Sequence, residues 1–97
     1  MKNTAVIIGA TGGIGNAFVK QLVVRKHNLV LVDINKMRLE QLAATIENEY
    51  RVNVEIITAN LANAHSIQEL AANLAARKRI DLLIHAAGYG EKTFFQH

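Results

Sequence analysis

Hydrophobic and polar residues follow one another along the chain in a pattern that predicts alternating strands and helices. Apolar runs rich in β-branched residues cover residues 4–8, 29–32 and 80–84, whereas residues 52–58 alternate between apolar and polar side chains. Continuous runs are typical of strands buried on both faces of a parallel sheet, and an alternating run is expected nearer a sheet edge. The pattern therefore predicts four strands.

The segments between these strands carry apolar residues at helical spacing. One stripe predicts a helix that opens in a glycine-rich loop and runs to about Lys26, and a second stripe follows residues 39–50. Ser66 and Glu69 stand in the Ser-x-x-Glu arrangement of a capping box and predict the start of a third helix, for which Asn63 is a competing cap.

This order of elements, β-α-β-α-β-α-β, predicts an α/β fold with a parallel sheet, right-handed crossovers and helices on both faces. The chain has 97 residues and no linker or low-complexity segment, so we expect residues 1–97 to form one domain. In the usual strand order of such sheets a fifth strand lies beside the fourth. Residues 80–84 are therefore expected to present an unpaired edge, and we predict self-association of the chain through it.

All six glycines follow the first or the fourth predicted strand, at positions that share one edge of a parallel sheet. Ligands of open α/β sheets bind along this edge, outside the carboxyl ends of the strands. Glycine permits positive φ and the close approach of a ligand, and the free N–H groups that open the next helix attract phosphate. We therefore predict a pyrophosphate site in the first loop, with an ordinary tight turn as the alternative. The glycines are Gly9, Gly12, Gly13 and Gly15 in the first loop and Gly88 and Gly90 in the second.

Asp33 ends the second predicted strand. A carboxylate there can accept hydrogen bonds from both hydroxyls of an adenosine ribose, and its charge would repel a 2′-phosphate. The sequence therefore favours NAD over NADP as the cofactor. Lys36 and Arg38 are near enough to reach a phosphate, although we interpret them as solvated residues that open a helix. A helix cap is the alternative role for Asp33.

The spacing Gly9-x-x-x-Gly13-x-Gly15 in GATGGIG resembles the cofactor loop of the short-chain dehydrogenase/reductase family. The resemblance extends from residue 5 to residue 90 and covers the first half of that family's pattern. It implies a Rossmann-like fold, here a truncated doubly wound sheet, and an oxidoreductase that transfers a hydride between nicotinamide and a carbonyl or alcohol substrate.

Two further stretches carry the resemblance. Residues 59–63 (ANLAN) resemble the family's adenine-binding segment, with Asn60 in place of its aspartate. Residues 82–88 (LLIHAAG) resemble its Asn-Asn-Ala-Gly segment, with His85 and Ala86 in place of the two asparagines. Together these motifs imply that the following residues bind the cofactor: Gly9, Thr11, Gly12, Gly13, Ile14, Gly15, Asp33, Ile34, Asn60, Leu61, Ala86, Ala87 and Gly88.

The family's catalytic serine and Tyr-x-x-x-Lys pair have no counterpart in these 97 residues. Tyr50 and Tyr89 are the only tyrosines, and the residues four positions on are Val54 and Thr93. We assign no catalytic residue and expect the 97-residue chain alone to be inactive, with substrate turned over only when the missing half is supplied. The alternative is a non-catalytic nucleotide-binding or partner-binding module.

The composition of the chain bears on disulfides, metal sites, membrane contact and nucleic-acid binding. The chain has no cysteine, which excludes disulfides and thiolate metal sites, and its four histidines share no spacing that suits metal ligands, so no metal is predicted. No stretch suits a signal peptide or a bilayer span, and we expect a cytoplasmic protein without membrane contact. The formal net charge of +3 is too small to argue for nucleic acid, although Arg77, Lys78 and Arg79 keep a nucleic-acid binder as a third and weaker possibility.

Overall fold

The computed structural model describes residues 3–86. Its seven elements follow the predicted order of strands and helices, which is thereby confirmed. They are β1 (Thr4–Ile8), α1 (Gly13–Val24), β2 (Asn28–Asp33), α2 (Lys36–Glu49), β3 (Val54–Thr58), α3 (Ala64–Ala75) and β4 (Leu82–His85).

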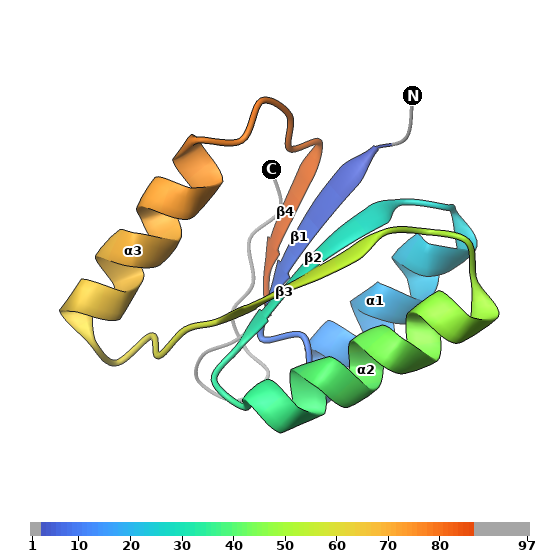
Figure 1. The fold of residues 1–97 in the computed structure, drawn as a ribbon, viewed down its shortest axis with the longest axis horizontal. Coiled ribbons are helices and arrows are strands. Elements are labelled where there is room, and N and C mark those ends of the chain that lie inside the picture. Colours follow the sequence, from blue (N-terminus) through green and yellow to red (C-terminus); the bar gives the residue numbers. More distant parts are fainter. Residues whose placement is uncertain (1–2, 87–97) are drawn as a thin grey trace.

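The four strands form one parallel sheet in the order β3-β2-β1-β4. At its centre Ile7 of β1 lies in register with Leu31 of β2 on one side and Ile84 of β4 on the other. Helices α1 and α2 cover one face of the sheet and α3 covers the opposite face (Figure 1). The parallel sheet, the helices on both faces and the edge position of β3 are therefore as predicted.

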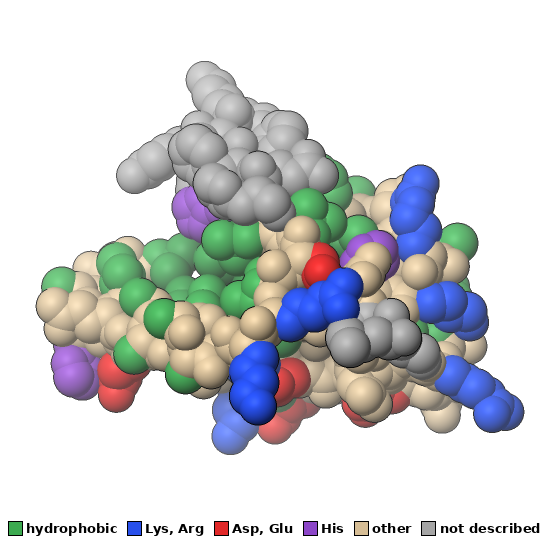
Figure 2. All heavy atoms as spheres, turned by 90° about the horizontal axis from the view of Figure 1, so that it is seen from above, with side chains coloured by type: hydrophobic (Ala, Val, Ile, Leu, Met, Phe, Trp, Pro, Cys, Tyr) green, Lys and Arg blue, Asp and Glu red, His purple; other side chains and the backbone are tan. Residues whose placement is uncertain are grey.

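Side chains of the two central strands alternate between the two faces of the sheet, as strand geometry requires. On the face of α1 and α2 the buried core includes Ala5, Ile7, Leu29, Leu31, Val19, Leu22, Leu39 and Ile46. On the other face Val6, Ile8, Val30 and Val32 pack with Leu70, the one buried residue of α3. Figure 2 shows hydrophobic side chains still gathered at the surface beside α3. Within residues 3–86, one face is thus packed against two helices and the other against α3 alone (Figure 1).

Helix α1 ends earlier than the sequence pattern predicts. Its last residue is Val24, Arg25 is the C-cap, and Lys26 has a left-handed φ of 64°. The Lys26 N–H donates to the Val23 carbonyl oxygen, and the next N–H donates to that of Leu22. These bonds turn the chain back toward β2, so α1 ends two residues before the predicted end at about Lys26.

The predicted capping box of the third helix is also wrong, and the competing cap is the one that forms. Asn63 is the N-cap of α3, and its side-chain oxygen accepts a hydrogen bond of 2.9 Å from the Ser66 N–H. The Ser66 hydroxyl instead accepts a bond of 2.8 Å from the Asn60 N–H. Asn63 and Ser66 therefore fix both the start of α3 and the loop that precedes it.

Strand β4 begins at Leu82 rather than at residue 80, because the side chain of Asp81, just before it, is held by hydrogen bonds. The Asp81 carboxylate accepts hydrogen bonds from the Thr4 N–H at 2.7 Å and from Arg79 Nε at 2.8 Å. The bond from Thr4 and then that from Arg79 hold the pKa of the Asp81 carboxyl below its usual value. Arg77 forms a second ion pair, with Glu55 of β3. Arg77 thus ties the segment after α3 to β3, and Arg79 bonds to the Asp81 carboxylate that holds the start of β1.

Candidate functional site

The glycine-rich loop between β1 and α1 is tied to the end of β2. The N–H groups of Gly9 and Ala10 donate to the Val32 carbonyl oxygen at 2.7 and 3.1 Å. Gly9 has a φ of 87°, in the left-handed region that favours glycine. The loop therefore has a fixed path across the carboxyl ends of two central strands.

Two glycines of this loop differ in what surrounds them. A Cβ on Gly15 would lie 2.0 Å from the Gly9 carbonyl oxygen, so only glycine lets α1 approach the loop this closely. A Cβ on Gly13 would meet no atom of the described chain within 4 Å. Packing within residues 3–86 thus explains Gly15 but not Gly13, whose missing side chain leaves open space at the start of the helix.

Among the described residues, no side chain caps the N-terminus of α1. Its N-cap is Gly12, whereas the Asn35 and Asn63 side chains cap α2 and α3. The first N–H groups of a helix have no partner within the helix, and together with the helix dipole they favour an anion. The open space at Gly13 and these N–H groups, which include those of Ile14 and Gly15, suit a phosphate group.

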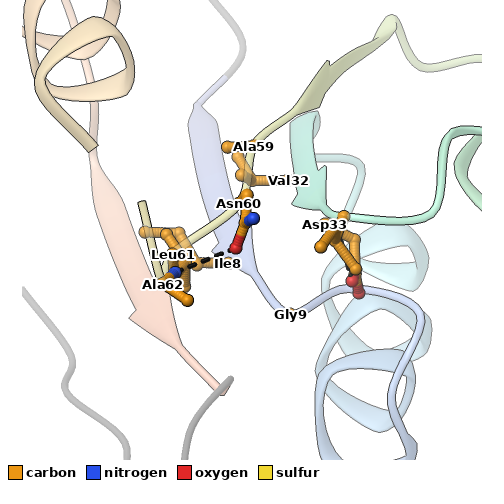
Figure 3. A pocket seen from close by; sticks show the side chains of 9 residues that line it. Ile8, Gly9, Val32, Asp33, Ala59, Asn60, Leu61 and Ala62 are labelled. Atoms are coloured by element: carbon orange, nitrogen blue, oxygen red, sulfur yellow. Dashed lines mark hydrogen bonds between the residues drawn. The ribbon is translucent and has the colours of Figure 1, made fainter. Parts of the chain in front are cut away.

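A pocket of about 220 Å³ opens beside the loop, at the carboxyl ends of β1, β2 and β3 (Figure 3). Its wall is mainly apolar, with Asp33 and Asn60 as its two polar side chains. The lining residues are Ile8, Gly9, Val32, Asp33, Ile34, Ala59, Asn60, Leu61 and Ala62. Five of them are among the residues for which the sequence predicts cofactor contact. The other four, Ile8, Val32, Ala59 and Ala62, were missed, although Ala59 and Ala62 flank Asn60 and Leu61 in the same short stretch.

The Asp33 carboxylate is bonded within the chain. Its Oδ2 accepts from the Thr11 N–H at 2.9 Å and from the Thr11 hydroxyl at 2.6 Å, while Oδ1 accepts from the Ile34 N–H at 2.7 Å. Since Asn35 is the N-cap of α2, the alternative interpretation of Asp33 as a helix cap is wrong.

The Asn60 side chain is oriented by its own loop. Its Oδ1 accepts a hydrogen bond of 2.9 Å from the Ala62 N–H, which Figure 3 shows as a dashed line. This bond leaves the amide NH₂ group as the hydrogen-bond donor that Asn60 can offer to the pocket. Ile34 also lines this pocket, and 60% of its surface is exposed, so a large apolar side chain is available to a ligand there.

Other predicted site residues lie outside the pocket. Thr11 contacts Asp33 and lines a separate polar hollow with Asn16, Arg38 and Thr45. Ala86 is buried at the end of β4, where its N–H donates to the Ile8 carbonyl oxygen at 2.8 Å. The predictions for Ala87 and Gly88, and the second pair of glycines with them, lie outside the described residues.

Among residues 3–86, no three or more histidine, aspartate or glutamate side chains are grouped so as to hold a metal ion. None of the three described helices is both long and apolar enough to cross a membrane.

Known proteins resemble this chain in both sequence and structure. The human inactive hydroxysteroid dehydrogenase-like protein 1 is 31% identical over 84 residues, which are 87% of this chain and 26% of that protein. The bulky-bulky ketone specific alcohol dehydrogenase from Comamonas testosteroni is 34% identical with a TM-score of 0.86, over 94% of this chain and 36% of that one. A short-chain dehydrogenase from Sphingobium yanoikuyae, in complex with NADPH, is 32% identical with a TM-score of 0.80, over 94% and 38%.

This chain therefore spans about a quarter of the human relative's length and little more than a third of each of the two solved chains. The model of the short chain dehydrogenase family matches residues 3–97, nearly the whole chain. With its parallel sheet, its glycine-rich loop and this match, the chain belongs to the short-chain dehydrogenase family.

Proposed function

We propose that this chain binds the adenosine and pyrophosphate end of NAD as part of an oxidoreductase. The observation that carries the proposal is the juxtaposition of an uncapped helix N-terminus, open at Gly13, with a pocket lined by Asp33 and Asn60. The first suits a phosphate group and the second suits a nucleoside, and both lie at the carboxyl edge of the sheet, where such folds bind ligands.

Each polar group has a role in this proposal. The N–H groups of the first turn of α1 hold the pyrophosphate, with Gly13 leaving room for it. Asp33 accepts a hydrogen bond from the adenosine ribose, and the Asn60 NH₂ group donates to the adenine edge, while Ile34 contacts the ring. When bound, the nicotinamide of NAD supplies hydride transfer; the residues described here bind and orient its adenosine end.

Asp33 is the reason for proposing NAD in preference to NADP. Its negative charge lies in the pocket wall, where it would repel a 2′-phosphate. Calorimetric titration of the chain with both cofactors is expected to give an affinity for NAD at least about tenfold higher. The Arg38→Gln variant is the control, because Arg38 is a cation on the neighbouring hollow. Tighter NADP binding that Arg38→Gln abolishes would refute the preference for NAD.

The reaction we propose for the whole oxidoreductase is hydride transfer to or from a carbonyl or alcohol substrate. The 97 residues contain no Tyr-x-x-x-Lys pair, so a polypeptide of residues 1–97 is proposed to bind NAD without turning it over. A non-catalytic nucleotide-binding module is the second candidate, favoured by a human relative whose name calls it inactive. Assays of the gene's full product against NAD and alcohols distinguish the two candidates.

Self-association through β4 belongs to the same proposal. Among residues 3–86, β4 pairs with β1 alone, so its outer edge offers backbone donors and acceptors to a second copy of the chain. Sedimentation velocity of residues 1–97 is expected to show a dimer that grows with concentration. A monomer over the whole range from micromolar to millimolar would contradict it.

A further inference from the structure

Thr11 was predicted as a cofactor ligand, but its polar groups are directed elsewhere. Both its N–H and its hydroxyl donate to the same oxygen of Asp33, at 2.9 and 2.6 Å. These bonds join the glycine-rich loop to the last residue of β2, at the position where the ribose is proposed to bind. The N–H of Thr11 is therefore not among those left for the pyrophosphate.

We infer that Thr11 is a positioning residue that holds the Asp33 carboxylate in place, so that Asp33 offers a single oxygen, Oδ1, to the adenosine ribose. The inference rests on the nucleotide site proposed above. It makes Thr11 a determinant of how the ribose is recognised, although its own polar groups would touch no cofactor atom.

Counting acceptor positions supports this role. An ionised carboxylate offers about four lone-pair positions, two on each oxygen. Thr11 occupies both positions of Oδ2, and the Ile34 N–H occupies one of Oδ1. One position is left, on Oδ1, so one ribose hydroxyl can donate to Asp33 while the Thr11 bonds are intact. The sequence-based expectation of two such hydroxyl contacts does not allow for these internal bonds.

Through the same contacts Asp33 also holds the glycine-rich loop in place. Hydrogen bonds to a charged acceptor are shorter and stronger than neutral ones, and here two of them hold the loop. An asparagine at this position has one acceptor oxygen and a donor NH₂ group, so it cannot accept from Thr11 and Ile34 in the same way. Asp33→Asn is therefore expected to weaken binding of both NAD and NADP instead of exchanging one for the other.

The test compares ADP with 2′-deoxy-ADP, which differ by one ribose hydroxyl, in calorimetric titrations of the full chain. Thr11→Val removes the hydroxyl and keeps the side-chain shape and the N–H, and Thr11→Ser keeps the hydroxyl. Thr45→Val is the matched control, since Thr45 lines the same hollow and donates to the Gln41 carbonyl oxygen.

We expect Thr11→Val to lower ADP affinity about tenfold, the effect of losing a hydrogen bond to a charged group. Its preference for ADP over 2′-deoxy-ADP should also fall toward one. Thr11→Ser and Thr45→Val should keep both the affinity and the preference. A loop that is merely loosened would weaken both ligands equally, so an unchanged preference in Thr11→Val, or tighter ADP binding, overturns the inference.

Failure of the proposed function would look different. If the unaltered chain binds neither ADP nor NAD, the nucleotide site is wrong, and the Thr11–Asp33 contact is judged from amide NMR spectra of the ligand-free chain. Asp33→Asn is then expected to shift the Thr11 amide proton upfield, because its charged acceptor is lost. A Thr11 resonance that Asp33→Asn leaves in place overturns the positioning role by itself.

Discussion

Gly15→Ala is expected to destabilise the fold by about 3 kcal/mol or more, the upper range for forcing extra atoms into a packed site. The added Cβ would lie 2.0 Å from the Gly9 carbonyl oxygen, 2.7 Å from the Gly9 carbonyl carbon and 3.0 Å from the Ala10 Cα. All three atoms belong to the backbone, so no side-chain rotation can relieve the clash. The loop cannot withdraw easily either, because the Gly9 and Ala10 N–H groups are bonded to Val32 of β2.

Urea denaturation followed by circular dichroism measures this effect, and Gly13→Ala is the matched control. A Cβ at Gly13 meets nothing within 4 Å in the described chain, and alanine favours a helix more than glycine does. Gly13→Ala should therefore unfold within about 1 kcal/mol of the unaltered chain. If Gly15→Ala were equally stable, α1 would not pack against the loop as closely as the structure shows.

Gly13 and Gly15 show which features of the site the sequence predicts and which it does not. The motif GATGGIG treats Gly13 and Gly15 alike, as parts of a cofactor loop. The structure separates them because a Cβ on Gly15 would lie against backbone atoms, whereas a Cβ on Gly13 would meet no atom of residues 3–86 within 4 Å. That difference depends on how closely α1 approaches the loop, a packing distance that residue spacing does not contain. Glycine content thus predicts where the site lies but not which glycine serves the fold.

Hydrophobic patterning predicts the fold itself well, for a physical reason. The apolar runs of β1 and β2 are buried on both faces of the sheet, and burial of such runs leaves few other arrangements. Ends of elements depend instead on single polar contacts. The Asn63 side chain caps α3, whereas the Ser66 hydroxyl accepts from the Asn60 N–H in the preceding loop. Strand β4 begins only after Asp81, whose carboxylate accepts from the Thr4 N–H.

The Thr11–Asp33 contact could not be predicted for a related reason. The two residues are 22 positions apart, and they meet because β1 and β2 are paired in register and the loop crosses the end of β2. From the sequence, Asp33 is an acidic residue with both oxygens available. The contact shows that the acceptors of a candidate ligand residue must be counted in the folded chain before its role is assigned.

Gly13→Val is expected to abolish NAD binding while leaving the fold intact. The branched side chain would project into the open space at the start of α1, where the pyrophosphate is proposed to lie. Its Cβ would meet no described atom within 4 Å, so the free energy of unfolding should change by less than about 1 kcal/mol, the difference in helix preference. NAD affinity should fall at least about 100-fold, equivalent to about 2.7 kcal/mol, since the ligand loses both the space and the helix N–H groups.

Ala44→Val is the control, because it adds a branched side chain of the same kind at an exposed position of α2. It should bind NAD as the unaltered chain does. Normal NAD binding by Gly13→Val would show that the N-terminus of α1 is not the pyrophosphate site, whatever occupies the pocket beside it. Loss of binding with unchanged stability has the opposite meaning: Gly13 serves the ligand and Gly15 serves the packing, so one short loop meets two separate requirements.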